Sequence, residues 1–117
     1  MESKAAVSAL AALAHPGRLE IFRLLVRAGP PGVAAGEIAR LTGTLPNTLS
    51  ASLNILSAAG LVSARREGRS IVYEAAFGRM GALLAFLTED CCGGAPEICA
   101  PLTEVLARTA CCERRPA

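Results

Sequence analysis

Residues 36–75 have the sequence GEIARLTGTLPNTLSASLNILSAAGLVSARREGRSIVYEA, and this stretch decides the expected fold. Its first part, residues 36–41, predicts a short helix that stops near Gly43. We expect Thr44 to cap a second helix, in whose first turn Pro46 is tolerated. Apolar residues then recur along this second helix at intervals of four and three: Leu49, Leu53 and Leu56.

A β-hairpin is predicted directly after the second helix, which Gly60 closes. Residues 61–66 and 69–75 have the composition of strands, and Glu67-Gly68 joins them as a two-residue turn. Apolar side chains alternate with polar positions along the two strands: Val62, Ala64, Ile71 and Tyr73. Two short helices, a tight turn and a β-ribbon in this order predict a winged helix-turn-helix, whose second helix enters the major groove of DNA.

Three further helices are predicted around this motif. Residues 5–14 and 16–28 show helical spacing, with Pro16 in the first turn of the second segment, and the loop Gly29-Pro30-Pro31-Gly32 follows. In residues 5–14 the apolar residues at helical spacing are Val7, Leu10, Leu13 and Ala14. In residues 16–28 the residues predicted to face the core are Leu19, Ile21, Phe22, Leu25 and Val26. The last helix runs from Phe77 to Thr88, and its apolar stripe needs a partner that dimerisation can supply: Phe77, Met80, Leu84 and Leu87.

Length and composition favour one helical domain. The 117 residues are 52% hydrophobic but only 3% aromatic, so the core must be built from Leu, Ile, Val and Ala. We expect a mainly α fold with a small β-hairpin, in dimeric form. Residues 1–92 form the winged helix-turn-helix DNA-binding and dimerisation domain, and residues 93–117 form a cysteine-containing extension. The sequence shows neither a secretion signal nor a membrane-spanning apolar run, which predicts a cytoplasmic protein without membrane contact.

The candidate DNA contacts follow from position, because a net charge of +2 neither requires nor excludes a polyanionic partner. The outer face of the second helix in the motif carries short groups that can hydrogen-bond base edges or phosphates: Asn47, Ser50 and Asn54, flanked by Thr48 and Ser52. Three arginines cluster at the tip of the predicted hairpin, where they can grip phosphates or enter a minor groove: Arg65, Arg66 and Arg69. Taken alone, the polar helix face is more typical of a solvated surface and the arginines are often present for solubility, whereas the winged-helix order favours DNA.

Three motifs resemble the ArsR/SmtB family of metalloregulators: LAHPGRLEI at residues 13–21, LNILSAAGLV at residues 53–62, and REGR at residues 66–69 followed by Tyr73. The similarity spans roughly residues 5–90. It implies the family's fold, dimeric state and operator binding. The recognition helix of the family, which is the second helix of the motif, commonly carries a His at the positions of Ala51 or Ser52, and this chain has none there.

Five cysteines lie in the last quarter of the chain, as Cys91-Cys92, Cys99 and Cys111-Cys112. In a reduced cytosolic protein they favour thiol chemistry over disulfide scaffolding. The break at Gly93-Gly94 lets the adjacent pair converge, and the loop after it is long enough to bring Cys99 beside the pair. Trivalent arsenic and antimony take three pyramidal bonds, whereas structural zinc prefers four tetrahedral ligands. The segment CCGGAPEIC also resembles an ArsR branch whose arsenite site lies at the end of the last helix.

The predicted ligands of As(III) or Sb(III) are therefore Cys91, Cys92 and Cys99, with Cys111 and Cys112 as additional candidates. The predicted function is a repressor that binds double-stranded operator DNA as a homodimer and dissociates when the metalloid binds, with no permanent cofactor. A thiol redox sensor, a sensor of methylated trivalent arsenic, and a winged helix that docks a protein remain open. Arsenate-reductase chemistry is not expected, since the sequence has no Cys-x₅-Arg loop and no His near the cysteines.

Overall fold

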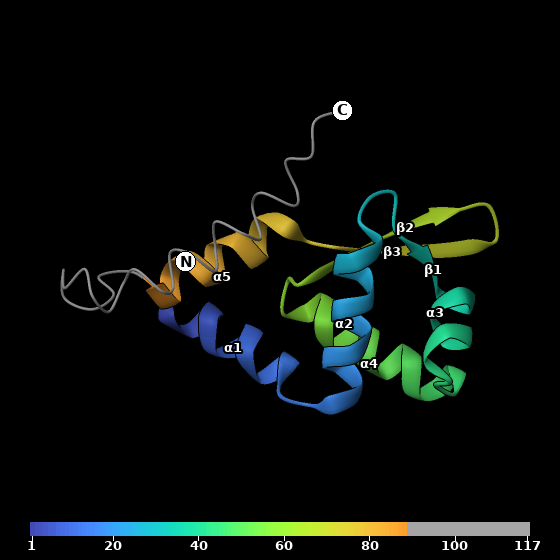
Figure 1. Ribbon diagram of the computed structural model, residues 1–117, viewed down its shortest axis with the longest axis horizontal. Helices are drawn as coiled ribbons and strands as arrows, with labels where there is room; N and C mark the ends of the chain where they lie inside the picture. Colours follow the sequence, from blue (N-terminus) through green and yellow to red (C-terminus); the bar gives the residue numbers. More distant parts are fainter. Residues whose placement is uncertain (89–117) are drawn as a thin grey trace. The chain divides into compact units, whose positions relative to one another are not determined.

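The computed structural model describes residues 1–88, and the chain divides into two units, Met1–Phe86 and Leu87–Ala117. The described residues form five helices and a three-stranded antiparallel sheet (Figure 1). In chain order the elements are α1 (Ser3–Leu13), α2 (Pro16–Ala28), β1 (Val33–Ala34), α3 (Ala35–Thr42), α4 (Pro46–Ala58), β2 (Val62–Glu67), β3 (Ser70–Ala75) and α5 (Phe77–Thr88). The predicted mainly helical winged helix-turn-helix is confirmed, while the predicted domain boundary after residue 92 lies outside the described residues.

His15 and Arg18 shape the corner between α1 and α2. His15 is the N-cap of α2, and its Nδ1 accepts hydrogen bonds from the backbone N–H of Gly17 at 3.1 Å and of Arg18 at 3.4 Å. Pro16 fills the first helical position, whose N–H needs no helical partner. The Nε of Arg18 donates to the carbonyl of Ala12 at 2.6 Å, and a cation is favourable at this end of α1. The predicted helix start at Pro16 is confirmed.

Three alanines form the buried face of α1: Ala6, Ala9 and Ala12. Val7 and Leu10 point away from the core instead, with 62% and 42% of their surface exposed. On α2 the prediction is confirmed for Ile21, Phe22 and Leu25, which are buried. It is wrong for Leu19, which is 42% exposed, because that residue lies on the side of α2 where Glu20 and Arg23 line an open surface depression.

The sheet has the strand order β1-β3-β2. Its hairpin was predicted, but the turn lies one residue later than expected: Glu67 pairs with Ser70, so Gly68 and Arg69 form the turn. This register places Gly68, with a φ of 64°, at the first turn position, where primed hairpin turns need a positive φ. The strand β1 was not predicted, because it has only two residues and takes its partners from β3, about forty residues further along the chain.

Gly32 brings the loop before β1 against β3. Its φ is 98°, and a Cβ atom at this position would lie 2.5 Å from the carbonyl oxygen of Tyr73. Such a separation is far below ordinary contact, so only glycine fits between the loop and the strand without a backbone shift.

The core lies where the helices meet the sheet. Its largest fully buried side chains are Ile21, Leu25, Ile38, Leu53, Leu56 and Leu61. From α5, Leu83 is buried, and Phe77 and Met80 pack against the same core, whereas Leu84 and Leu87 are 40% and 51% exposed. The predicted apolar stripe of α5 is therefore divided between residues that pack against the core and residues that are exposed.

Among residues 1–88, no helix combines the length and the apolar character that crossing a bilayer requires.

Candidate nucleic-acid interface

The turn between α3 and α4 is held by Gly43 and two threonines. Gly43 ends α3 in the left-handed conformation, with a φ of 69°. The hydroxyl of Thr42 donates to the carbonyl of Ile38 at 2.8 Å and lies 2.7 Å from the hydroxyl of Thr44. The predicted stop near Gly43 is confirmed. The predicted cap is wrong: Leu45 is the N-cap of α4, because the Thr44 side chain bonds back to Thr42 instead of forward.

The helix α4 has a buried apolar face and an exposed polar face without charge. The buried face carries Leu49, Leu53 and Leu56, each less than 5% exposed. The predicted contacts Asn47, Thr48, Ser50 and Asn54 are all exposed. No Asp, Glu, Lys or Arg occurs at any position from 41 to 64. The polar groups that α4 presents to solvent are therefore amides and hydroxyls, which discriminate base edges by hydrogen bonding.

Ser52 does not belong to this exposed face, and its prediction as a DNA contact is wrong. Only 7% of its surface is exposed. Ser52 lies three residues after Leu49 and four before Leu56, and residues at these intervals share one side of a helix. Its side chain is consequently directed toward the protein and not toward a groove of DNA.

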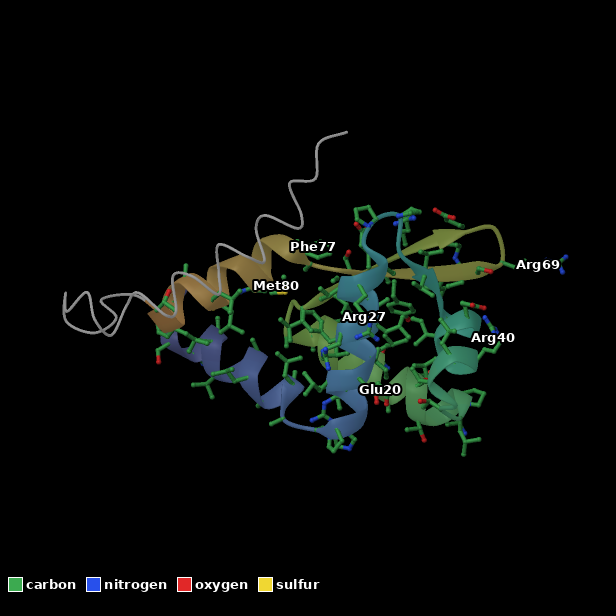
Figure 2. The ribbon with its side chains drawn as sticks, viewed as in Figure 1. Glu20, Arg27, Arg40, Arg69, Phe77 and Met80 are labelled. Carbon is green, nitrogen blue, oxygen red and sulfur yellow. The ribbon has the colours of Figure 1, made fainter. Side chains whose placement is uncertain are left out.

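Two arginines of the hairpin, Arg66 and Arg69, are exposed. Arg66 lies on β2 opposite Ile71, and Arg69 projects outward from the turn (Figure 2). Within residues 1–88 neither side chain forms an ion pair or a hydrogen bond with another residue. Their guanidinium groups are thus available for phosphate oxygens, which arginine binds through two parallel hydrogen bonds.

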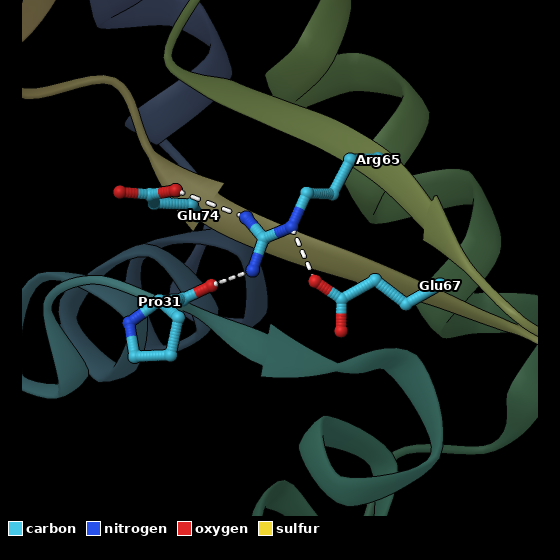
Figure 3. Close-up of polar contacts among 4 residues, drawn as sticks. All are labelled: Pro31, Arg65, Glu67 and Glu74. Carbon is cyan, nitrogen blue, oxygen red and sulfur yellow. Dashed lines mark hydrogen bonds and ion pairs between the residues drawn. The ribbon is translucent and has the colours of Figure 1, made fainter.

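Arg65 differs from its neighbours, because the protein itself binds its guanidinium group (Figure 3). Nε donates to Oε2 of Glu67 at 2.6 Å, Nη1 to Oε1 of Glu74 at 3.3 Å, and Nη2 to the carbonyl oxygen of Pro31 at 2.5 Å. The hydrogen bond that Arg65 donates to Glu67 is the main cause that raises the pKa of Arg65 above its ordinary value. The prediction that Arg65 clusters with the other two at the hairpin tip is wrong, since it pairs with Val72 in the middle of β2.

An open depression of about 340 Å³ lies between α4 and the hairpin. Ser50 of α4 and Arg69 and Ser70 of the hairpin supply polar groups to its lining, and Ile71 and Tyr73 of β3 supply apolar ones. The depression shows that the exposed face of α4 and Arg69 of the turn border one surface. This arrangement allows both elements to contact one duplex.

The positive charge of the chain is concentrated in its described part. Residues 1–88 contain nine Lys and Arg against five Asp and Glu, a net charge of +4, while residues 89–117 carry three Lys and Arg against five Asp and Glu, a net charge of −2.

Arg40, on the exposed side of α3, forms an ion pair with Glu37 one turn earlier. This hydrogen bond lowers the pKa of the Glu37 carboxyl and raises that of Arg40.

Sequence reasoning missed the partners of Arg65. Glu67 and Glu74 become recognisable once the register is known, because they lie on the same side of the hairpin as Arg65. The carbonyl of Pro31 carries no such signal, since it comes from a loop 34 positions away in the sequence.

All five cysteines lie outside the described residues. Among residues 1–88 there is no group of three or more His, Cys, Asp or Glu side chains that could hold a metal ion. The prediction that Cys91, Cys92 and Cys99 bind a metalloid, and that of additional ligands at Cys111 and Cys112, therefore stay predictions.

A helix with a buried apolar face after a tight turn, followed by a hairpin whose Arg66 and Arg69 have no partner within residues 1–88, defines a winged helix-turn-helix DNA-binding protein. Residues 13–64 match the model of a helix-turn-helix domain family. The chain is 33% identical over 87 residues to the HTH-type transcriptional regulator YgaV of Escherichia coli, which covers 74% of this chain and 86% of YgaV.

Solved structures agree with this class. A homodimeric winged helix-turn-helix DNA-binding domain from Mycobacterium bovis is 34% identical, with a TM-score of 0.59 over 74% of this chain and 81% of that one. An ArsR-like transcriptional regulator from Rhodococcus sp. RHA1 is 26% identical, with a TM-score of 0.64 over 91% of this chain and 90% of that one. The chain belongs to the ArsR family of winged helix-turn-helix transcriptional regulators, and it is a DNA-binding protein and not an enzyme.

Proposed function

We propose that the protein is a cytoplasmic repressor that binds operator DNA as a homodimer and releases it when As(III) or Sb(III) binds Cys91, Cys92 and Cys99. The observation that carries the proposal is the position of three thiols within nine residues, three residues after α5 ends at Thr88. An ArsR-family chain with its thiols at this point joins a DNA-binding surface to a donor set for soft ions.

The chemistry of the donor set favours a trivalent metalloid over zinc. Three thiolates satisfy the three pyramidal bonds of As(III) or Sb(III), whereas zinc takes a fourth ligand that is usually Cys or His. The single histidine of the chain is His15, and its Nδ1 already accepts two backbone hydrogen bonds at the start of α2. The thiols would hold the metalloid as thiolates, and it enters as the inducer, not as a resident cofactor.

In the proposed dimer, α4 of each subunit is a recognition helix, so the dimer has two of them. The relative from Mycobacterium bovis is homodimeric, and in this chain Val7 and Leu10 leave an apolar edge on the outer side of α1. A twofold dimer places its two recognition helices in major grooves about one helical turn of DNA apart, near 34–36 Å. A change of that separation misaligns both half-sites together.

Release follows from linkage between the two sites. If As(III) binds the DNA-free dimer more tightly than the DNA-bound dimer, it must weaken DNA binding by the same factor, and no contact between the sites is needed. Factors of about 5 to 150 are typical of allosteric proteins.

The test is fluorescence anisotropy of a labelled duplex from upstream of the protein's own gene, titrated with reduced protein and then with arsenite, Zn²⁺ or Cd²⁺. Arsenite is expected to release the duplex, and Cys91→Ser to abolish the release. The double variant Cys111→Ser/Cys112→Ser is the matched control: a retained response confines the site to the three proposed ligands, and a lost response extends it. DNA binding that ignores arsenite would overturn the proposal.

The same assay separates the alternatives. Cys99→Ser should impair the response to arsenite more than the response to methylarsenite, since two thiols suffice for the methylated species. Release by peroxide in the absence of arsenic, reversed by a thiol reductant, would assign the cysteines to redox sensing.

A further inference from the structure

Arg65 reaches across the sheet. Because the strand order is β1-β3-β2, the strand that carries Arg65 is not adjacent to β1. Its guanidinium group nevertheless bonds the carbonyl of Pro31, in the loop that precedes β1, while Glu67 and Glu74 bind its other two nitrogens. The side chain therefore spans β3 from one edge of the sheet to the loop beyond the other edge (Figure 3).

The burial of Val72 is consistent with this crossing. Val72 is the residue of β3 that pairs with Arg65, and directly opposed side chains in an antiparallel pair lie on the same face. Only 8% of the Val72 surface is exposed, although its face of the hairpin is otherwise polar: Ser63, Arg65, Glu67, Ser70 and Glu74. The apolar stem of an arginine can cover such a residue while its charged head makes polar contacts.

The face on which Arg65 lies is the one turned away from α4. Ile71 and Tyr73 line the depression beside α4, and they share their face of the hairpin with Arg66, which pairs with Ile71. Side chains of consecutive strand residues point to opposite faces, so Arg65 lies on the other side. Adjacent arginines of one strand thus have different surroundings.

We propose that Arg65 is a positioning residue for DNA binding and not a phosphate contact. It ties β2 to the loop before β1, and this tie fixes the hairpin turn, with Arg69, relative to the exposed face of α4. Glu67 and Glu74 oppose its charge, so Arg65 adds little attraction for phosphates, whereas Arg66 and Arg69 keep theirs. The inference rests on the DNA-binding activity of the family and is independent of the proposed arsenic response.

The test compares Arg65→Gln with Arg66→Gln, two neighbouring variants with the same change of charge, without arsenite. Affinity for a labelled operator duplex is measured from 50 to 300 mM salt, and amide hydrogen exchange of residues 62–75 is measured on the DNA-free protein. Removal of one phosphate contact changes the slope of log K against log salt by about 0.9. Because the proposed dimer carries two copies of Arg66, Arg66→Gln is expected to change the slope by about twice that amount, about 1.8, and to leave the exchange unaltered.

Arg65→Gln is expected to weaken binding about three- to tenfold with less than half of that slope change, and to speed exchange in the hairpin severalfold. Arg65→Lys keeps the charge but not the planar fork that reaches three acceptors, so the same pattern is expected in this folded, charge-preserving variant. A full slope change in Arg65→Gln with unaltered exchange and a wild-type Arg65→Lys would overturn the proposal. A wild-type protein that binds no duplex would overturn the DNA-binding function instead.

Discussion

Replacement of Gly32 by alanine tests how closely the loop before β1 is fitted to the sheet. Gly32 has a φ of 98°, and the new Cβ atom would lie 2.5 Å from the carbonyl oxygen of Tyr73 and 3.2 Å from the Cβ of Glu74. A positive φ costs a residue with a Cβ about 1–2 kcal/mol. Because the obstructing atom belongs to the backbone of β3, relief requires a shift of strand or loop, which we expect to cost a further 1–3 kcal/mol or so, as in overpacked cores.

Gly43, which ends α3, provides a control with a positive φ and open surroundings. Its φ of 69° lies in the left-handed region, and a Cβ atom at this position would meet no atom within 4 Å. Gly43→Ala therefore carries the conformational cost alone, and both variants gain the same reduction of unfolded-chain entropy, about 0.4–1 kcal/mol. The expected loss is about 1–4.5 kcal/mol for Gly32→Ala and about 0–1.6 kcal/mol for Gly43→Ala.

The assay is urea denaturation followed by circular dichroism, with both variants at one protein concentration because a dimer's stability depends on concentration. The free energies of unfolding should differ by about 1–3 kcal/mol between the two variants. Equal losses would refute the close approach of the loop to Tyr73, since that contact accounts for the expected difference.

Three further outcomes are expected. Leu53→Ala should lower the free energy of unfolding by about 2–5 kcal/mol in the same urea assay, since the side chain is 1% exposed in the core; a loss below 1 kcal/mol would contradict that burial. Asn54→Ala should weaken operator binding by about 1–3 kcal/mol while binding to unrelated duplex and the salt slope stay unchanged, as competition anisotropy can measure; Ser57→Ala, further along α4, is the comparison. Val7→Glu should shift the protein toward monomer in sedimentation velocity, and an unchanged dimer would remove α1 from the interface.

Helical periodicity predicted most of the fold. The stripe Leu49, Leu53 and Leu56 fixes the inner face of α4, and glycine at position 43 marks the end of α3, because both signals are local. The sequence could not indicate β1, whose two residues gain their structure only from pairing with distant Val72 and Tyr73. The hairpin was placed one residue early, since the strand composition of residues 61–75 does not by itself decide which two residues form the turn.

The candidate interface was predicted except where packing decides. Asn47 and Asn54 are exposed as expected. Ser52 was predicted from its polar side chain alone, but it lies on the buried side of α4 with the leucines. Arg65 was grouped with Arg66 and Arg69 because all three are close in sequence. The register of β2 and β3 separates them, and register depends on the turn and the buried face, not on local composition.

The absence of charge from position 41 to 64 separates two tasks on the DNA surface. Counterion release, which holds a protein on any duplex and lets it slide, depends on arginines outside α4. Substitutions among Asn47, Ser50 and Asn54 can therefore change which operator is chosen while the time spent on arbitrary chromosomal DNA stays the same. A regulator built in this way can acquire a new target site without losing the speed of its search.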